Sequence, residues 1–111
     1  MNELLLEMRT FADQQGVPVL RQEAERLLRL LMKRYQPLRI LEIGTAIGYS
    51  ALLMAQLVPN CRILTLEKDE ERIRDAQRFW QRDPGISERI RLWEGDAAER
   101  LSALNETFDF V

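Results

Sequence analysis

Histidine is absent from this 111-residue sequence, and cysteine occurs only once, as Cys61. Without histidine, the chain cannot build a Ser-His-Asp or Cys-His catalytic site, or a zinc site with histidine ligands, from its own residues. A single cysteine cannot form a disulfide within the chain, and we assign Cys61 no role. Most of the common hydrolytic chemistries are therefore excluded for this chain alone.

Long apolar runs are also missing. No run approaches the roughly 20 residues that a helix needs to cross a bilayer, so we expect no transmembrane helix and no membrane partner. The first seven residues, MNELLLE, lack the basic start and small-residue cleavage site of a secretory signal. The expected location is the cytoplasm.

The sequence has no excess of positive charge. Sixteen Lys and Arg against eighteen Asp and Glu give a net charge of −2, so a nucleic-acid partner would need a local basic patch. Residues 21–35 hold a surplus of three positive charges, which could meet RNA phosphates. The simpler interpretation of these charges is a solvated helix face.

Two helices, each with one apolar stripe, are predicted at the start of the chain. Apolar residues recur at three- and four-residue steps over residues 2–15 and again over residues 21–35. Gly16 ends the first pattern, Pro18 interrupts the link, and Pro37 closes the second pattern. The side chains expected to face inward are Leu4, Leu5, Met8, Phe11 and Ala12 in the first helix, and Ala24, Leu27, Leu28, Leu31 and Met32 in the second.

Short apolar runs then alternate with helical stretches. Strands are expected at 39–43, 62–67 and 89–93, and the start of a fourth at 108–111. Helices are expected at 49–58, 69–82 and 97–104, with a turn at Asp83-Pro84-Gly85. This alternation predicts an α/β fold of right-handed βαβ units, with a parallel sheet covered on both faces. Ligands of such sheets bind beyond the carboxyl ends of the strands.

Three of these strand ends carry residues suited to a nucleoside. Gly44 and Gly48 follow the first strand, where a missing Cβ lets a ligand approach the main chain at the start of a helix. Glu67 ends the second strand, where a carboxylate can accept ribose hydroxyls. Asp96 follows the third. The alternatives are a tight turn without a ligand for the glycines, a solvent-facing carboxylate for Glu67 and a helix N-cap for Asp96.

Two common nucleotide motifs do not fit. A dinucleotide motif G-x-G-x-x-G that starts at Gly44 needs glycine at positions 46 and 49, where the chain has Ala46 and Tyr49. A phosphate-binding P-loop ends in Gly-Lys-Ser/Thr, where the chain has Tyr49, Ser50 and Ala51. A dinucleotide and a nucleoside triphosphate are therefore both disfavoured.

The run from Ile40 to Ala51, ILEIGTAIGYSA, resembles motif I of the S-adenosylmethionine-dependent O-methyltransferases of the catechol and caffeoyl-CoA type. The residues Tyr49, Ser50 and Ala51 carry the part that is specific to this group. The segment from Val17 to Leu20, with the helix after it, most resembles the bacterial members that methylate 5-hydroxyuridine in transfer RNA (tRNA).

The resemblance implies how S-adenosylmethionine is bound. Gly44, Ala46 and Ser50 would hold its methionine end, and Glu67 would bind the ribose hydroxyls. Lys68 would lie beside the adenosine, Asp96 and the backbone of Ala97 would face the adenine edge, and Pro18 to Leu20 would line the entrance. The implied set of cofactor-binding residues is Leu20, Gly44, Ala46, Ser50, Glu67, Lys68, Asp96 and Ala97.

The resemblance also implies a Rossmann-like class I methyltransferase fold that is truncated in strand four. Residues 1–37 would form N-terminal helices at the substrate entrance and in a homodimer interface, and residues 38–111 the first half of the cofactor-binding domain. An unpaired fourth strand would favour self-association.

The metal-binding residues of the family are expected after Val111. A divalent cation, expected to be magnesium, would therefore belong to a longer parent protein, and we expect no catalytic or metal-binding residue within this chain. Asp109 comes too early to be the metal ligand. The function implied is methyl transfer to 5-hydroxyuridine in tRNA. The alternatives are a small-molecule catechol or acyl-CoA O-methyltransferase and a non-catalytic nucleoside-binding module.

Overall fold

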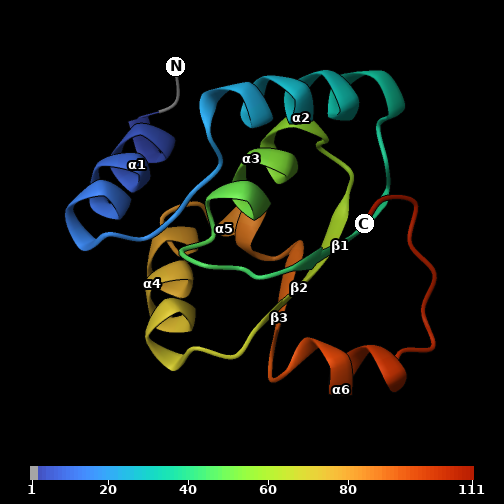
Figure 1. Ribbon diagram of the computed structural model, residues 1–111. Coiled ribbons are helices and arrows are strands. Elements are labelled where there is room, and N and C mark those ends of the chain that lie inside the picture. The colour runs from blue at the N-terminus through green and yellow to red at the C-terminus, as the bar shows by residue number, and fades with distance from the viewer. Residues whose placement is uncertain (1–2) are drawn as a thin grey trace.

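The structure is a computed structural model that describes residues 3–111, and a parallel sheet of three strands lies at its centre (Figure 1). The strands are ordered β1-β2-β3. The elements are α1 (Glu3–Gln15), α2 (Gln22–Tyr35), β1 (Arg39–Ile43), α3 (Tyr49–Leu57), β2 (Arg62–Glu67), α4 (Glu70–Trp80), α5 (Pro84–Ser87), β3 (Ile90–Glu94) and α6 (Ala97–Ser102).

The register of the strands gives the sheet two distinct faces. Ile40 is aligned with Ile63, and Ile63 with Ile90, so three β-branched side chains lie in one row across the sheet. This row belongs to the main core. Leu41 and Leu64 are the next aligned pair and belong to a second, smaller cluster. Both faces of the sheet are therefore apolar, as the α/β prediction requires.

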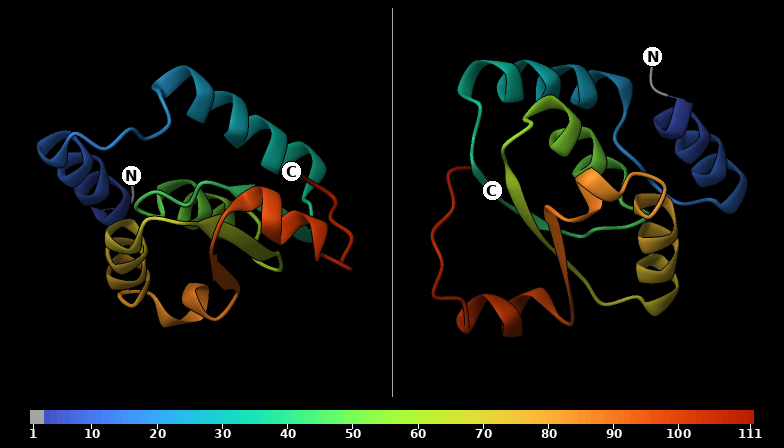
Figure 2. Two further views of the ribbon diagram at one scale, coloured as in Figure 1. Left: turned by 60° about the horizontal axis from the view of Figure 1, so that its bottom comes forward. Right: turned by 180° about the vertical axis from the view of Figure 1, so that it is seen from behind.

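The helices cover these faces unequally. The main core joins the sheet to α1, α2, α3 and α4, and includes the fully buried Met8, Met32 and Leu52. The second cluster is covered by Ala97 of α6 and by Leu104 and Phe108 in the segment after it. Figure 2 shows α6 standing apart from α1 and α2, with the strands between them.

The last residues of the chain return to β1. The amide of Leu41 donates to the carbonyl of Phe110 over 2.9 Å, and the amide of Asp109 donates to the carbonyl of Arg39 over 2.8 Å. Ile40 and Phe110 form one parallel bridge, so the predicted fourth strand is present only as a single pairing. Because β2 lies on the other side of β1, the strand order reverses here, where α/β sheets bind their ligands.

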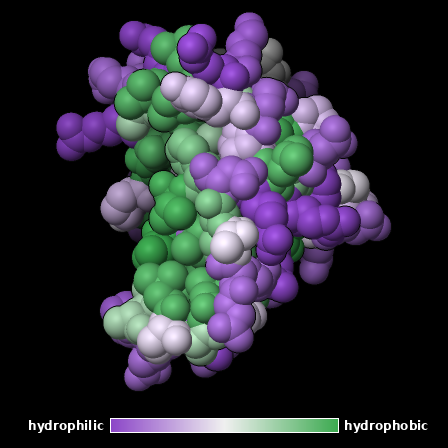
Figure 3. Space-filling model, turned by 90° about the vertical axis from the view of Figure 1, so that its right-hand side faces the viewer, coloured by the Kyte–Doolittle hydropathy of each residue, from purple (hydrophilic) through white to green (hydrophobic). Residues whose placement is uncertain are grey.

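Asp109 has a local role in this pairing. Its carboxylate accepts hydrogen bonds from the amides of Leu38 and Arg39, over 2.7 and 3.2 Å. It therefore fastens the end of the chain to the start of β1. The surface beside β1 is largely apolar (Figure 3) and includes the exposed Ile43 and Val111.

Two sequence predictions need correction, and a third cannot be compared. Ala24 and Leu27 of α2 are exposed, because the side of this helix that packs inward is centred on Leu28 and Met32. The predicted turn at Asp83-Pro84-Gly85 is the start of the short helix α5, in which Asp83 caps the amide of Ile86. Asn2, the predicted start of the first helix, lies outside the described residues.

Candidate functional site

The turn after β1 is bound to the neighbouring strand through its main chain. The amides of Gly44 and Thr45 both donate to the carbonyl of Leu66, over 2.8 and 3.1 Å. Gly44 has a φ of +90°, and a Cβ built there meets no atom within 4 Å. The left-handed backbone requires glycine, and the open space beside it leaves room for a ligand to approach the main chain.

The carboxylate of Glu67 joins two strand ends. Its Oε1 accepts a hydrogen bond of 2.8 Å from the amide of Ala46, and its Oε2 accepts longer ones from the amides of Lys68 and Asp69. Ala46 has a φ of +50°, a conformation that is uncommon outside glycine, and this hydrogen bond helps to hold it. Glu67 is therefore half-buried between two turns, unlike the solvent-facing carboxylate of the alternative prediction.

The end of β3 adjoins the end of β2. Glu67 is aligned with Glu94, and the amide of Gly95 donates to the carbonyl of Glu67 over 2.9 Å. The next residue, Asp96, is the N-cap of α6, and its carboxylate accepts the amide of Ala98 over 2.8 Å. The predicted N-cap role is confirmed, and the other carboxylate oxygen of this exposed residue has no protein partner among the described residues.

Gly48 has a different reason to be glycine from the one expected. A Cβ at this position would lie 2.5 Å from Nε1 of Trp80, whose indole donates to the Gly48 carbonyl over 3.0 Å. The residue is buried against this ring. The Trp80 contact is therefore a structural reason for glycine at position 48, and the approach of a ligand to its main chain stays a prediction.

Leu20 and Ser50 line one hollow of about 380 Å³ beside β1. Glu42, Ile43 and Val111 line the same hollow. Ser50 lies in the first turn of α3, and its hydroxyl has no hydrogen-bond partner among residues 3–111. The predicted entrance residue and the predicted methionine-end residue thus share one space. Lys68 is exposed, and Ala97 is half-buried at the start of α6.

Larger hollows lie away from these strand ends. One of about 550 Å³ is at the amino ends of the strands, between Arg39, Arg62 and Arg89. Another of about 620 Å³ lies between α1 and α4. Neither contains a residue from the predicted cofactor-binding set, so volume alone does not identify the site.

Glu42 is a residue that the sequence analysis did not select. Its Oε1 accepts a hydrogen bond of 2.8 Å from the hydroxyl of Thr65, which is itself 2.7 Å from the hydroxyl of Thr45. Burial raises the pKa of Glu42 to about 7, and the nearby charge of Glu67 acts in the same direction. The sequence did contain a sign of this residue, because the carboxyl group of Glu42 lies between the apolar residues Leu41 and Ile43 of β1.

The first residue of α3 connects the site to the N-terminal helices. The hydroxyl of Tyr49 donates to Oε1 of Glu25 over 2.5 Å and accepts from Nε of Arg9 over 3.0 Å. Burial raises the pKa of Tyr49, and its hydrogen bond to Glu25 adds to the rise. The Arg9–Glu25–Tyr49 cluster therefore ties α1 and α2 to the turn that carries Gly44 and Ala46.

Residues 3–111 contain no group of three or more His, Cys, Asp or Glu side chains that could hold a metal ion. Within the same residues, no helix has the length and apolar character needed to span a membrane.

The comparison with known proteins assigns the class. The O-methyltransferase family profile matches residues 1–111, and this chain belongs to that family. A catechol O-methyltransferase from Niastella koreensis is 37% identical over 82 residues, which cover 73% of this chain and 37% of that protein.

Solved structures agree with the family. An O-methyltransferase from Bacillus cereus, in complex with S-adenosylhomocysteine (SAH), has a TM-score of 0.84 and 26% identity over 99% of this chain and 53% of that one. The O-methyltransferase TomG from Streptomyces achromogenes, in complex with S-adenosylmethionine (SAM), has a TM-score of 0.78 and 28% identity over 96% of this chain and 48% of that one. The fold is therefore the Rossmann-like α/β fold of class I O-methyltransferases. The chain spans about half the length of these structures and 37% of the Niastella protein.

Proposed function

We propose that this chain supplies the cofactor-binding strand ends of a SAM-dependent O-methyltransferase whose acceptor is 5-hydroxyuridine in tRNA. The observation that supports this most directly is the hydrogen bond of 2.8 Å between the amide of Ala46 and the carboxylate of Glu67. It brings a ribose-accepting group next to a turn that has open space at Gly44. The SAM and SAH complexes of the similar structures support the choice of cofactor.

In this proposal each strand end binds one part of the cofactor. The methionine end of SAM is held by Gly44, Ala46 and Ser50. The Ser50 hydroxyl, which has no hydrogen-bond partner among residues 3–111, donates a hydrogen bond to the carboxylate of SAM. Glu67 already accepts three amides, which leaves about one of its four lone-pair sites free, on Oε1. To bind both ribose hydroxyls it would exchange the longest of these hydrogen bonds, from the amide of Lys68, for the second hydroxyl. Asp96, which uses one oxygen to cap α6, accepts from the adenine amino group with the other.

Three further contacts complete the proposed site. The backbone of Ala97 faces the adenine edge, the exposed Lys68 lies beside the adenosine, and Leu20 lines the entrance to the hollow that it shares with Ser50. None of these residues takes part in bond making. Their contribution is to bind the cofactor and fix the direction of its methyl group.

The reaction is an in-line displacement. The ionised acceptor oxygen forms a bond to the methyl carbon as the bond from that carbon to the sulfonium sulfur breaks, which gives a methyl ether and SAH. Anion and cation neutralise each other in the transition state, so a closed site that holds them in contact without water favours the step. The proton of the acceptor hydroxyl passes to solvent water before the oxygen attacks.

A divalent cation, with magnesium preferred, is part of the proposal for the longer protein. Such an ion would lower the pKa of the acceptor hydroxyl and orient it. Residues 3–111 hold no ligand cluster for it, so its ligands would come from outside them. We also propose that residues 1–37 form the entrance and a homodimer interface, and that the protein acts in the cytoplasm.

A second candidate is methylation of a small catechol or acyl-CoA. The 37% identity to the Niastella catechol O-methyltransferase favours it. The first proposal prefers tRNA because of the Val17–Leu20 segment and the basic helix that follows it.

An acceptor assay tests the choice. The full-length protein that carries this chain would be incubated with methyl-labelled SAM and one of three acceptors: tRNA with 5-hydroxyuridine, a catechol or an acyl-CoA. Transfer to the hydroxylated tRNA, with none to the same tRNA carrying unmodified uridine, is the expected result. Methyl transfer to catechol alone would contradict the proposal that tRNA is the acceptor. Cofactor binding without methyl transfer to any acceptor would favour a non-catalytic nucleoside-binding module.

A further inference from the structure

One segment of this chain, residues 21–35, carries a net positive charge although the whole chain is acidic. Residues 21–35 hold five Arg or Lys against two Glu, whereas the other residues hold eleven against sixteen. The chain as a whole is therefore acidic, with a net charge of −2, but the segment that contains α2 is basic. Anions are therefore attracted to the segment that contains α2 more than to the rest of the chain.

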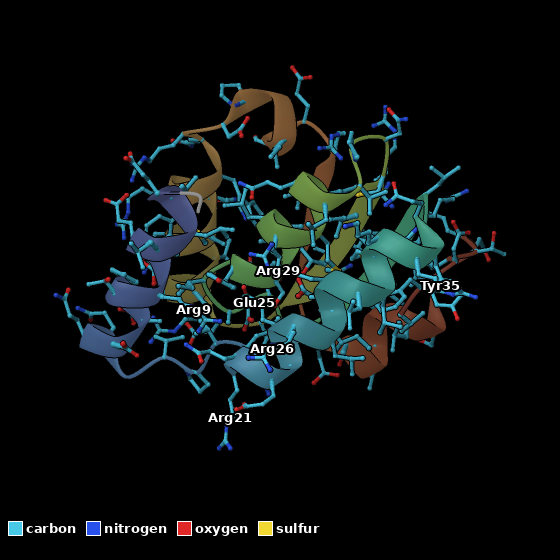
Figure 4. The ribbon with its side chains drawn as sticks, turned by 90° about the horizontal axis from the view of Figure 1, so that it is seen from above. Arg9, Arg21, Glu25, Arg26, Arg29 and Tyr35 are labelled. Carbon is cyan, nitrogen blue, oxygen red and sulfur yellow. The ribbon has the colours of Figure 1, made fainter. Side chains whose placement is uncertain are left out.

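Most of these cations are not neutralised by carboxylates of the same molecule. Arg29 shares Glu25 with Arg9, but Arg21, Arg26, Lys33 and Arg34 form no ion pair with any residue between 3 and 111. All four side chains belong to exposed residues. Figure 4 shows Arg21 extending away from the body of the molecule, and Arg9 and Arg29 on either side of Glu25.

Of the two acids in this segment, Glu23 is exposed to solvent and Glu25 forms contacts inside the molecule. The side chain of Glu25 is only 16% exposed, and hydrogen bonds from Tyr49, Arg9 and Arg29 outweigh the effect of burial and lower its pKa. It therefore holds two guanidinium groups in fixed positions instead of repelling an anion from the surface. The result is a row of cations, Arg26, Arg29 and Lys33, spaced by three and four residues on one side of α2.

Some of these cations lie next to residues of the candidate site in the sequence. Arg26 and Arg29 line a hollow of about 330 Å³ together with Tyr49, the residue before Ser50. Arg21 directly follows Leu20, which lines the hollow beside β1. From Arg21 to Lys33 these side chains span about 18 Å along the helix axis at 1.5 Å per residue, which is too long for one diphosphate and suits several phosphates of a polynucleotide.

We propose that Arg21, Arg26, Arg29 and Lys33 form a phosphate-binding surface for the backbone of an RNA acceptor, which they guide toward the carboxyl ends of the strands. This inference rests on the proposed function, because it assumes that the acceptor is part of an RNA. Contacts of this kind bind without reading sequence and weaken as salt displaces them. The cation row thus supplies affinity and orientation, and the strand ends supply the methyl donor.

Charge reversal tests the surface. The double variant Arg21→Glu/Arg26→Glu would be compared with Arg62→Glu/Arg74→Glu, which changes the net charge equally at exposed positions on β2 and α4. Binding of a fluorescent tRNA transcript would be measured by anisotropy between about 50 and 200 mM salt. We expect the first variant to bind at least about tenfold more weakly, with a salt slope shallower by about one unit for each lost contact.

The control variant should stay within about threefold of wild type. Equal weakening of tRNA binding in both variants would show that only net charge matters, and would contradict the proposed phosphate-binding surface. A wild-type protein that binds no tRNA would contradict it as well. Thermal melting of each variant establishes that it is folded.

The same variants separate this inference from the proposed function. If wild type methylates hydroxylated tRNA and Arg21→Glu/Arg26→Glu does so with an unchanged KM for tRNA, the surface is wrong and the function stands. If the arginines determine the affinity for tRNA but no methyl group is transferred to tRNA, the proposed acceptor is wrong and the proposed phosphate-binding surface is supported.

Discussion

The indole nitrogen of Trp80 donates a hydrogen bond of 3.0 Å to the carbonyl of Gly48, so the end of α4 supports the turn that precedes α3. The two residues are 32 positions apart in the sequence. The contact explains why position 48 needs glycine: its φ is +87°, and the Trp80 ring occupies the space that a Cβ would take.

The first prediction follows from this contact. Gly48→Ala should lower the free energy of unfolding by about 2–4 kcal/mol, because it adds both backbone strain and overlap with a buried ring. Urea unfolding measures the change. Gly85→Ala is the control, since a Cβ there meets only Asp83 Oδ1 at 3.8 Å and its φ is not left-handed. It should change stability by less than about 1 kcal/mol, and an equal loss in both variants would contradict the account.

A second prediction concerns Glu42 and pH. Its pKa in the folded protein is about 7, above the ordinary 4.5, so the folded state binds this proton more tightly than the unfolded state. Ionisation therefore destabilises the fold: the cost is absent below pH 4.5, grows as the pH rises, and is complete above about 7. Relative to Glu42→Gln, the wild type should lose up to roughly 3 kcal/mol over this range.

Urea unfolding of both proteins at several pH values measures this difference. Glu94→Gln serves as the control, because Glu94 is an exposed carboxylate at the neighbouring strand end. A stability difference between wild type and Glu42→Gln that does not change with pH would show that Glu42 ionises normally in the folded state.

The third prediction concerns the cluster that joins the N-terminal helices to the site. Tyr49→Phe removes the hydroxyl that bonds to both Arg9 and Glu25, and should destabilise the fold by about 1–3 kcal/mol. Tyr35→Phe removes a hydroxyl from a residue that is 65% exposed and should have almost no effect. Thermal melting compares the two. Indistinguishable melting temperatures would mean that the cluster contributes nothing to the docking of α1 and α2.

Much of the fold follows from local patterns. Ile40, Ile63 and Ile90 lie in apolar runs bounded by turn residues, and all three belong to strands of the sheet. A helix was expected to begin at residue 69, and the carboxylate of Asp69 accepts the amides of Glu71 and Arg72 at the start of α4. Signals of this kind lie within a few residues of each other, so the sequence alone can reveal them.

What the sequence could not predict depends on distant contacts or on competing local signals. Nothing near Gly48 indicates that Trp80 packs on it. The residues Asp83, Pro84 and Gly85 suit a turn, but the same Asp and Pro also suit the N-cap and first position of a helix, which is what forms. The spacing of apolar residues in α2 reveals a stripe but not its centre, so Leu27 was placed in the core although it is 56% exposed.

The candidate site was predictable in part for the same reason. Strand ends of a parallel sheet must meet at one edge, so the proximity of Gly44, Glu67 and Asp96 follows once the strands are recognised. The pairing of Glu67 with the Ala46 amide, and the burial of Glu42, depend on the shape of a turn that the sequence does not specify. The roles of these residues toward a cofactor stay predictions.

The most direct test of the shared nucleoside site is calorimetric titration of SAM and SAH into the protein and two matched variants. Glu67→Ala should weaken both ligands by roughly 10–100-fold, because it removes a charged acceptor for the ribose hydroxyls. Glu94→Ala, which removes the aligned carboxylate of the next strand, should stay within about twofold of wild type. Unchanged affinity in a folded Glu67→Ala variant, or equal loss in both variants, would contradict the assignment.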